Sequence, residues 1–125
     1  MLHTIIAIIL ILHGLIHLIG FVVNWKLVTI EDIPYKNSIV AGKIRVGGVG
    51  IRVIGVLWLL AAIGFVVAGI GLFVMAPWWL TLTFWMSLFS LALCIAGWPE
   101  AQFGAYTNMN ILVYLLARES FIWLP

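Results

Sequence analysis

The residues best suited to chemistry in this sequence are its three histidines, His3, His13 and His17. In a helix that turns roughly 100° per residue they share one face, and His13 and His17 lie one turn apart, about 6 Å along the axis. Imidazoles can bind a metal, ligate a haem or chlorin, relay protons or hydrogen-bond a quinone. They can also fix helix packing by bonding to polar side chains of neighbouring helices. His13 and His17 are therefore candidate ligand-binding residues, with packing as the alternative interpretation.

Geometry limits the metal and haem interpretations. A haem held by two histidines needs one on each face of its ring, which two histidines on the same face of one helix cannot provide. Such a site would need a second subunit, or Met75, Met86 or Met109 as the other ligand. A two-histidine metal site lacks a clear third ligand, because the acidic residues cluster at predicted helix ends. The sequence requires no cofactor, and His13 and His17 alone would make an under-ligated metal site.

Composition places these histidines in a membrane. Apolar residues make up 66% of the 125 residues and charged residues 8%. Soluble domains are about 45–50% apolar and about 25% charged, and a chain this short has too much surface to hide the difference. The net charge of +2 is too small to indicate nucleic acid binding. The single cysteine, Cys94, excludes an internal disulfide and any CxxC motif.

Four apolar runs predict the architecture, since a spanning helix needs about 20 mostly apolar residues. They lie at about 2–23, 48–76, 78–98 and 103–124 and predict one integral membrane domain over 1–125, an all-α, antiparallel four-transmembrane-helix bundle. The first run lacks the basic start and the cleavage site of a signal peptide, so we interpret it as a retained span. The loop at 24–47 carries Lys26, Lys36, Lys43 and Arg45. The positive-inside rule therefore places this loop in the cytoplasm and both termini outside.

Six residues are predicted to anchor the helix ends at the membrane surface. A tryptophan there rests its ring in lipid and its N–H among head groups, and a long arginine side chain can reach the surface from within a helix. The predicted anchors are Trp25, Trp78, Trp79, Trp98, Trp123 and Arg118.

Small and polar residues form stripes on the later helices. The third run carries Thr83, Ser87, Ser90, Cys94 and Gly97 at steps of four, three, four and three. Membrane helices pack closely through such residues, so this stripe and Gly64 of the second run are predicted packing sites. In the fourth run Asn110 and Tyr114 share a face with Thr107 and Arg118. We predict that this face forms a polar wall opposite the histidines, which makes Asn110 and Tyr114 further candidate ligand-binding residues.

Two segments resemble known families. Residues 13–21, HGLIHLIGF, resemble the HGLxHLxGF signature of a family of small bacterial four-span proteins that often carry the label "ABC transporter permease". Residues 97–104, GWPEAQFG, followed by Asn108 and Asn110, resemble that family's segment before its last helix, with Gln102 where a lysine is expected. More distantly, the first segment is similar to the HGLxKLFG pattern of the DoxX-like group, which has a lysine where this chain has His17. The resemblance implies a multi-pass protein of the bacterial inner membrane.

Three functions follow as predictions. The first is an accessory or structural subunit of a larger membrane complex, with other membrane proteins or further copies of this chain as partners. The second, which the DoxX-like resemblance implies, is a redox-linked or hydrophobic-ligand-binding protein that holds a quinone, lipid, haem or chlorin at His13 and His17. The third is a transporter or channel for a small solute or proton. An enzyme of the soluble type is disfavoured, because no nucleophile–base pair or paired carboxylates stand out and no catalytic residue can be named.

Overall fold

The computed structural model describes the backbone of residues 2–123 and the side chains of residues 2–117. Its elements are α1 (Leu2–Ile16), α2 (Leu18–Asn24), β1 (Ser38–Ile39), β2 (Ile44–Arg45), α3 (Gly47–Phe73), α4 (Trp79–Ala96) and α5 (Gln102–Trp123). The strands form one short antiparallel hairpin in the loop that joins α2 to α3. The chain is thus all-α apart from this hairpin, as its apolar runs predicted.

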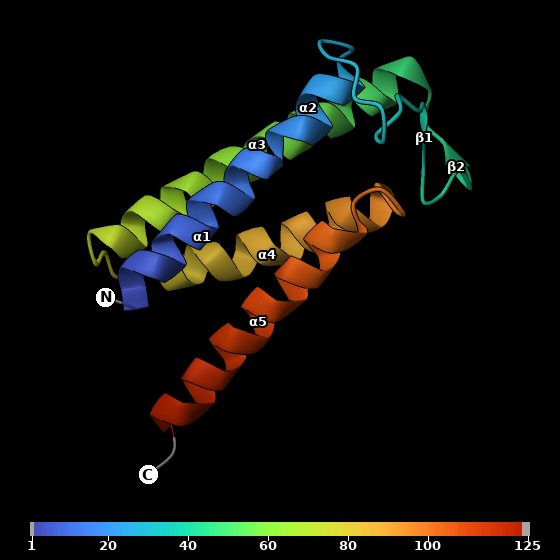
Figure 1. Cartoon of the computed structure of the whole chain (residues 1–125). Helices are drawn as coiled ribbons and strands as arrows, with labels where there is room; N and C mark the ends of the chain where they lie inside the picture. The colour runs from blue at the N-terminus through green and yellow to red at the C-terminus, as the bar shows by residue number, and fades with distance from the viewer. Residues whose placement is uncertain (1, 124–125) are drawn as a thin grey trace.

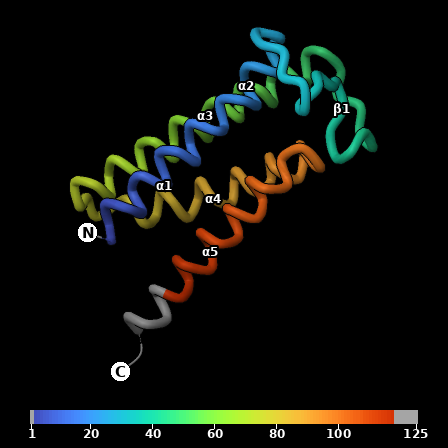
Figure 2. Tube along the Cα trace, in the orientation of Figure 1, coloured from blue at the N-terminus to red at the C-terminus, as the bar shows by residue number. Residues whose placement is uncertain are grey.

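The helices follow one another up and down the molecule. Figure 1 shows α1 and α2 running beside α3 in the opposite direction, α4 running back along them, and α5 returning toward the end where α1 begins. The hairpin loop and the turn between α4 and α5 lie together at the other end, as the tube in Figure 2 also shows. Residues from both halves of the chain therefore meet at this loop end.

Among the residues that the structure describes, three segments are long and apolar enough to cross a membrane: Leu2–Asn24, Gly47–Phe73 and Trp79–Ala96, with mean hydropathies of 2.7, 2.7 and 1.8. They correspond to the first three predicted spans, although the second and third end at Phe73 and Ala96 rather than at 76 and 98. Helix α5 forms where the fourth span was expected but is less apolar, because glutamine, asparagine and tyrosine residues occupy its first half. The fourth span therefore stays a prediction.

The first span is not one continuous helix, because it breaks at His17. The His17 backbone N–H bonds to the Gly14 carbonyl at 3.0 Å instead of to the carbonyl four residues back. That carbonyl, of His13, accepts a hydrogen bond from Nδ1 of the His17 ring at 2.7 Å. A side chain that inserts into the backbone ladder is a recognised cause of helix kinks. The His17 side chain thus satisfies the His13 carbonyl, which the His17 backbone N–H does not bond.

Helices α1 and α3 approach closely through glycines. A Cβ built on Gly14 would lie 2.9 Å from the Ala62 carbonyl oxygen, and one built on Gly69 would lie 2.8 Å from the Ala7 carbonyl oxygen. Backbone this close leaves no room for a side chain, which is how membrane helices gain contact area without a hydrophobic driving force between them. The close packing presses α1 against α3 along its length and fixes which face of α1 points inward.

An apolar core fills the end of the bundle away from the loop. It consists of the buried side chains Ala7, Leu10, Phe65, Leu72, Trp79 and Leu115, which come from α1, α3, α4 and α5. Along the bundle axis toward the loop, this core is followed by a group of buried polar side chains and then by a cavity. The bundle is therefore layered along its axis.

The predicted packing residues lie inside the bundle. Thr83, Ser87, Ser90 and Cys94 are buried on α4, and Gly97 is partly buried against Trp58. Gly64 faces α4, where an added Cβ would stand 2.0 Å from the Met86 sulfur.

The predicted anchors differ among themselves. Trp25 and Trp78 are exposed at helix ends and Trp98 is half-buried. Trp79 is buried instead, because it begins α4 on the face that packs into the core. The side chains of Arg118 and Trp123 lie outside the described part of the structure.

Candidate functional site

A closed ring of hydrogen bonds links three helices in the middle of the bundle. The His13 ring bonds through Nε2 to Oδ1 of Asn108 at 2.8 Å, and Nδ2 of Asn108 bonds to Oγ of Ser90 at 2.8 Å. The Ser90 hydroxyl also bonds to Nε2 of His17, whose Nδ1 returns to the His13 carbonyl. All four side chains are buried, at 5% exposure or less.

The direction of every bond in this ring is determined. A carbonyl can only accept a hydrogen bond, so Nδ1 of His17 must carry the imidazole proton. The neutral imidazole of His17 then accepts a hydrogen bond at Nε2. Ser90 must therefore donate to His17, which leaves its oxygen free to accept from the Asn108 amide. The Asn108 carbonyl oxygen in turn accepts from Nε2–H of His13. Two neutral imidazoles of opposite tautomer satisfy the whole ring, which suits a buried place where charge is expensive.

Local sequence brings Asn108 to this ring. Gly104 lies one turn before it, and a Cβ there would stand 2.9 Å from the Cys94 sulfur. The missing side chain lets α5 approach α4, so the Asn108 amide reaches Ser90 and also lies 3.6 Å from the Cys94 sulfur. Among the described side chains, Ser87 Oγ is the buried polar atom without a hydrogen-bond partner.

The polar wall predicted on α5 is not opposite the histidines. Asn110 and Tyr114 are exposed, with Tyr114 at 39%, whereas Asn108 is fully buried. Two residues along a helix rotate a side chain by about 200°, so Asn108 and Asn110 point to nearly opposite sides. The prediction chose the more polar face of α5. The spacing of the buried Ala105, Asn108 and Leu115 marks the inner face instead, and this apolar stripe with one asparagine is the signal that could have found it.

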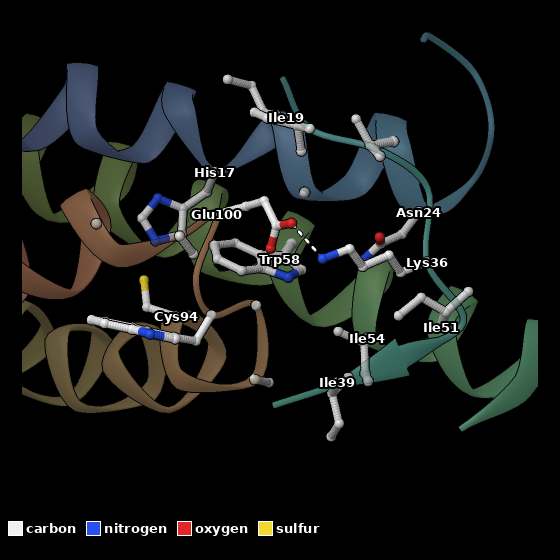
Figure 3. A pocket seen from close by; sticks show the side chains of 18 of the residues that line it. His17, Ile19, Asn24, Lys36, Ile39, Ile51, Ile54, Trp58, Cys94 and Glu100 are labelled. Atoms are coloured by element: carbon white, nitrogen blue, oxygen red, sulfur yellow. Dashed lines mark hydrogen bonds and ion pairs between the residues drawn. The ribbon is translucent and has the colours of Figure 1, made fainter. Parts of the chain in front are cut away.

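A cavity of about 220 Å³ opens beside the hydrogen-bonded side chains of His13 and His17, toward the loop end. His13, His17 and Cys94 lie at its deep end, and Figure 3 shows His17 and Cys94 there with Trp58 beside them. Most of its lining is apolar and comes from the helices near the loop and from the loop itself: Ile16, Ile19, Val23, Ile33, Ile39, Ile51, Ile54, Trp98 and Phe103. The cavity thus combines apolar walls with hydrogen-bonding groups at one end.

One wall of the cavity is the Trp58 ring. Gly20 of α2 gives this ring its place, because an added Cβ would meet the indole at 2.5 Å. The ring of His17 lies 5.3 Å from that of Trp58, centre to centre. A flat ligand entering the cavity would therefore meet an aromatic wall next to an imidazole.

The mouth of the cavity carries opposite charges. Lys36 of the loop forms an ion pair with Glu100 of the turn between α4 and α5, drawn in Figure 3. Partial burial alone would raise the pKa of the Glu100 carboxyl, but the hydrogen bond and charge of Lys36 outweigh it and hold this pKa below its ordinary value. Backbone bonds from Val40 to Ala96 and from Ala41 to Trp98, at 2.8 and 3.0 Å, tie the same loop to the end of α4.

Three of the four nitrogens of His13 and His17 take part in hydrogen bonds, which leaves Nδ1 of His13 with a lone pair. Within the described residues no group of three or more histidine, cysteine or acidic side chains is placed to hold an ion. The arrangement fits a ligand that is held by shape and by hydrogen bonds.

Comparison with known proteins adds no family: no family model, curated protein or solved structure matches this chain.

Proposed function

We propose that this chain is a multi-pass protein of the bacterial inner membrane, with four spans, the loop at 24–47 in the cytoplasm and both termini outside. Support comes from three apolar helices and from the return of α5 to the end where α1 begins. Apolar side chains on the outer faces of the helices, such as Ile9, Val53 and Ile63, are about half exposed, which lipid would cover. Asn108 on α5 is buried in the bundle, so the less apolar fourth helix still hides its most polar inward group.

Within this membrane protein, the function that the geometry supports best is the binding of a small, mostly apolar ligand in the cavity between the helices and the loop. The observation that carries this proposal is the cavity itself, with apolar walls, an aromatic side at Trp58 and histidines at its deep end. Ligand sites of this kind are mostly apolar with a few placed polar groups. The flat head group of a quinone matches the aromatic wall at Trp58 and the apolar lining around it.

The accessory-subunit and transport hypotheses have less support. The described polar side chains close into a ring instead of continuing as a path through the bundle. The apolar outer faces would suit a membrane partner and lipid equally well. Both hypotheses, like the DoxX-like resemblance, stay predictions.

The test is to purify the protein from its native membrane in mild detergent, extract it with organic solvent and identify bound small molecules by mass spectrometry. A short-chain benzoquinone added to the stripped protein then serves as a defined probe, because quinones quench the fluorescence of a nearby tryptophan such as Trp58. We expect a near-stoichiometric ligand and saturable quenching.

Two variants of helix α3 make this test specific. Ile54→Trp places an indole ring in the cavity and should abolish binding, whereas Ile63→Trp makes the same change on a 53% exposed outer face and should leave it intact. Equal binding by both variants, or a native protein that neither carries a ligand nor binds the probe, would count against the cavity as a ligand site.

A further inference from the structure

A second recess, of about 240 Å³, lies beside the start of α3 at the loop end of the molecule. Two cationic side chains line it, Lys26 from the loop and Arg52 from the second turn of α3. Asn24, Tyr35, Gly48 and Val49 complete the lining, and none of these described residues is acidic. The recess is thus separate from the ligand cavity, with Asn24 as the shared residue, and its character is cationic.

Aromatic rings hold both cations in place without neutralising them. The Lys26 ammonium lies 4.5 Å from the centre of the Tyr35 ring, and the Arg52 guanidinium lies 5.8 Å from that of Trp25. The Trp25 indole N–H donates to the Arg52 carbonyl at 2.9 Å, which fixes this ring against α3. Cation–π contacts orient a charged group and leave its N–H donors available. Across residues 2–117 the ion pair is that of Lys36 with Glu100, so no carboxylate competes for these donors.

Two cations, a side-chain amide and a phenol that converge on one recess match the several oxygens of a phosphate group. The rim adds an apolar element, because Val49 is 78% exposed at the edge of the recess. Free phosphate has no apolar atoms to contact this rim, whereas a phospholipid places its glycerol and acyl chains beside its phosphate. We propose that this recess binds the phosphate of an anionic phospholipid. Binding here would seat the start of α3 and the base of the loop at the head-group level.

Charge-matched variants test this site against general attraction to an anionic surface. Lys26→Gln and Arg52→Gln each remove one positive charge from the recess. Lys43→Gln and Arg45→Gln remove one charge each from the same loop but outside the recess. Purified protein in detergent is titrated with phosphatidylglycerol or phosphatidylcholine of the same acyl chains, and native mass spectrometry counts the bound lipids.

The recess variants should weaken the first phosphatidylglycerol bound by about fivefold, the value of one basic residue near a membrane surface, and the two control variants by less than about twofold. Arg52→Lys, which keeps the charge, should keep most of the affinity. Equal weakening by all four glutamine variants, or no preference over phosphatidylcholine, would overturn the proposal. Inorganic phosphate at millimolar concentration should leave lipid binding unchanged. Displacement that depends on Lys26 and Arg52 would reassign the recess to free phosphate and overturn the lipid assignment.

Discussion

Replacing Asn108 by alanine should destabilise the protein far more than the same change at Asn110, two residues away on the same helix. Asn108 is fully buried and makes two hydrogen bonds, to His13 and Ser90, both at 2.8 Å. Asn110 is exposed. The two variants lose identical atoms from one helix, so the change in helix propensity cancels between them.

The expected loss of folding free energy follows from the hydrogen bonds that Asn108 makes. Hydrogen bonds between membrane helices contribute about 0.6 kcal/mol each on average, so two bonds account for about 1.2 kcal/mol. Asn108→Ala also leaves the His13 N–H without its acceptor, and a buried unsatisfied donor costs about 1–3 kcal/mol. The sum is about 2–4 kcal/mol for Asn108→Ala, against less than about 0.5 kcal/mol for an exposed position such as Asn110.

The assay is equilibrium unfolding in mixed detergent micelles with increasing sodium dodecyl sulfate, followed by circular dichroism. A double-mutant cycle of His13→Ala and Asn108→Ala then isolates their interaction, for which we expect a coupling of about 0.5–1.5 kcal/mol. A difference between Asn108→Ala and Asn110→Ala below about 0.5 kcal/mol, together with zero coupling to His13, would refute the closed ring.

Three further predictions use other parts of the molecule. Gly14→Ala should destabilise the same unfolding equilibrium by about 1–3 kcal/mol, because its Cβ meets backbone 2.9 Å away, and by more than Gly64→Ala, whose Cβ meets only a flexible methionine sulfur; equal effects would contradict this close approach. Ser87→Ala should be neutral or stabilising, by up to about 1 kcal/mol, because its hydroxyl is buried without a partner in the described structure; a clear loss of stability would show that the hydroxyl is bonded. The ion pair of Lys36 with Glu100 should hold the loop in place at pH values above the ordinary glutamate pKa of about 4.3. It should release the loop as the pH falls toward the lower pKa of Glu100 in the folded state. Hydrogen exchange of the loop should therefore become faster on acidification, relative to its intrinsic rate, and this acceleration should be absent in Glu100→Gln.

Much of the fold could be predicted from hydropathy, because a lipid-facing helix must be apolar over its whole length. The positions of α1 with α2, of α3 and of α4 follow the predicted runs within a few residues. The break at His17 escaped prediction, since the 3.6-residue period assumes an unbroken ladder of backbone bonds. The pair His13 and His17 gave no signal for it, because the carbonyl that Nδ1 of His17 bonds is a backbone group that any residue at position 13 would supply.

The site was predictable in part. The arc of histidines indicated an inward face for α1, and the structure buries His13 and His17 there. The partner on α5 was missed, because polarity was taken to point inward everywhere. In α5 the structure exposes Asn110 and Tyr114, and the inward polar group is the one asparagine, Asn108, in the apolar stripe. The cavity depends on how the loop folds over the helix ends, which no periodicity encodes.

The ring of hydrogen bonds also sets an order of events during biosynthesis. His13 and Asn108 are 95 residues apart, so the first helix is made long before the helix that carries its partner. Until α5 arrives, the His13 N–H faces either lipid or a temporary partner, such as the insertion machinery. A nascent chain that ends before Gln102 would therefore hold a His13 N–H without its acceptor, and the last helix supplies that acceptor to a first helix already packed against α3.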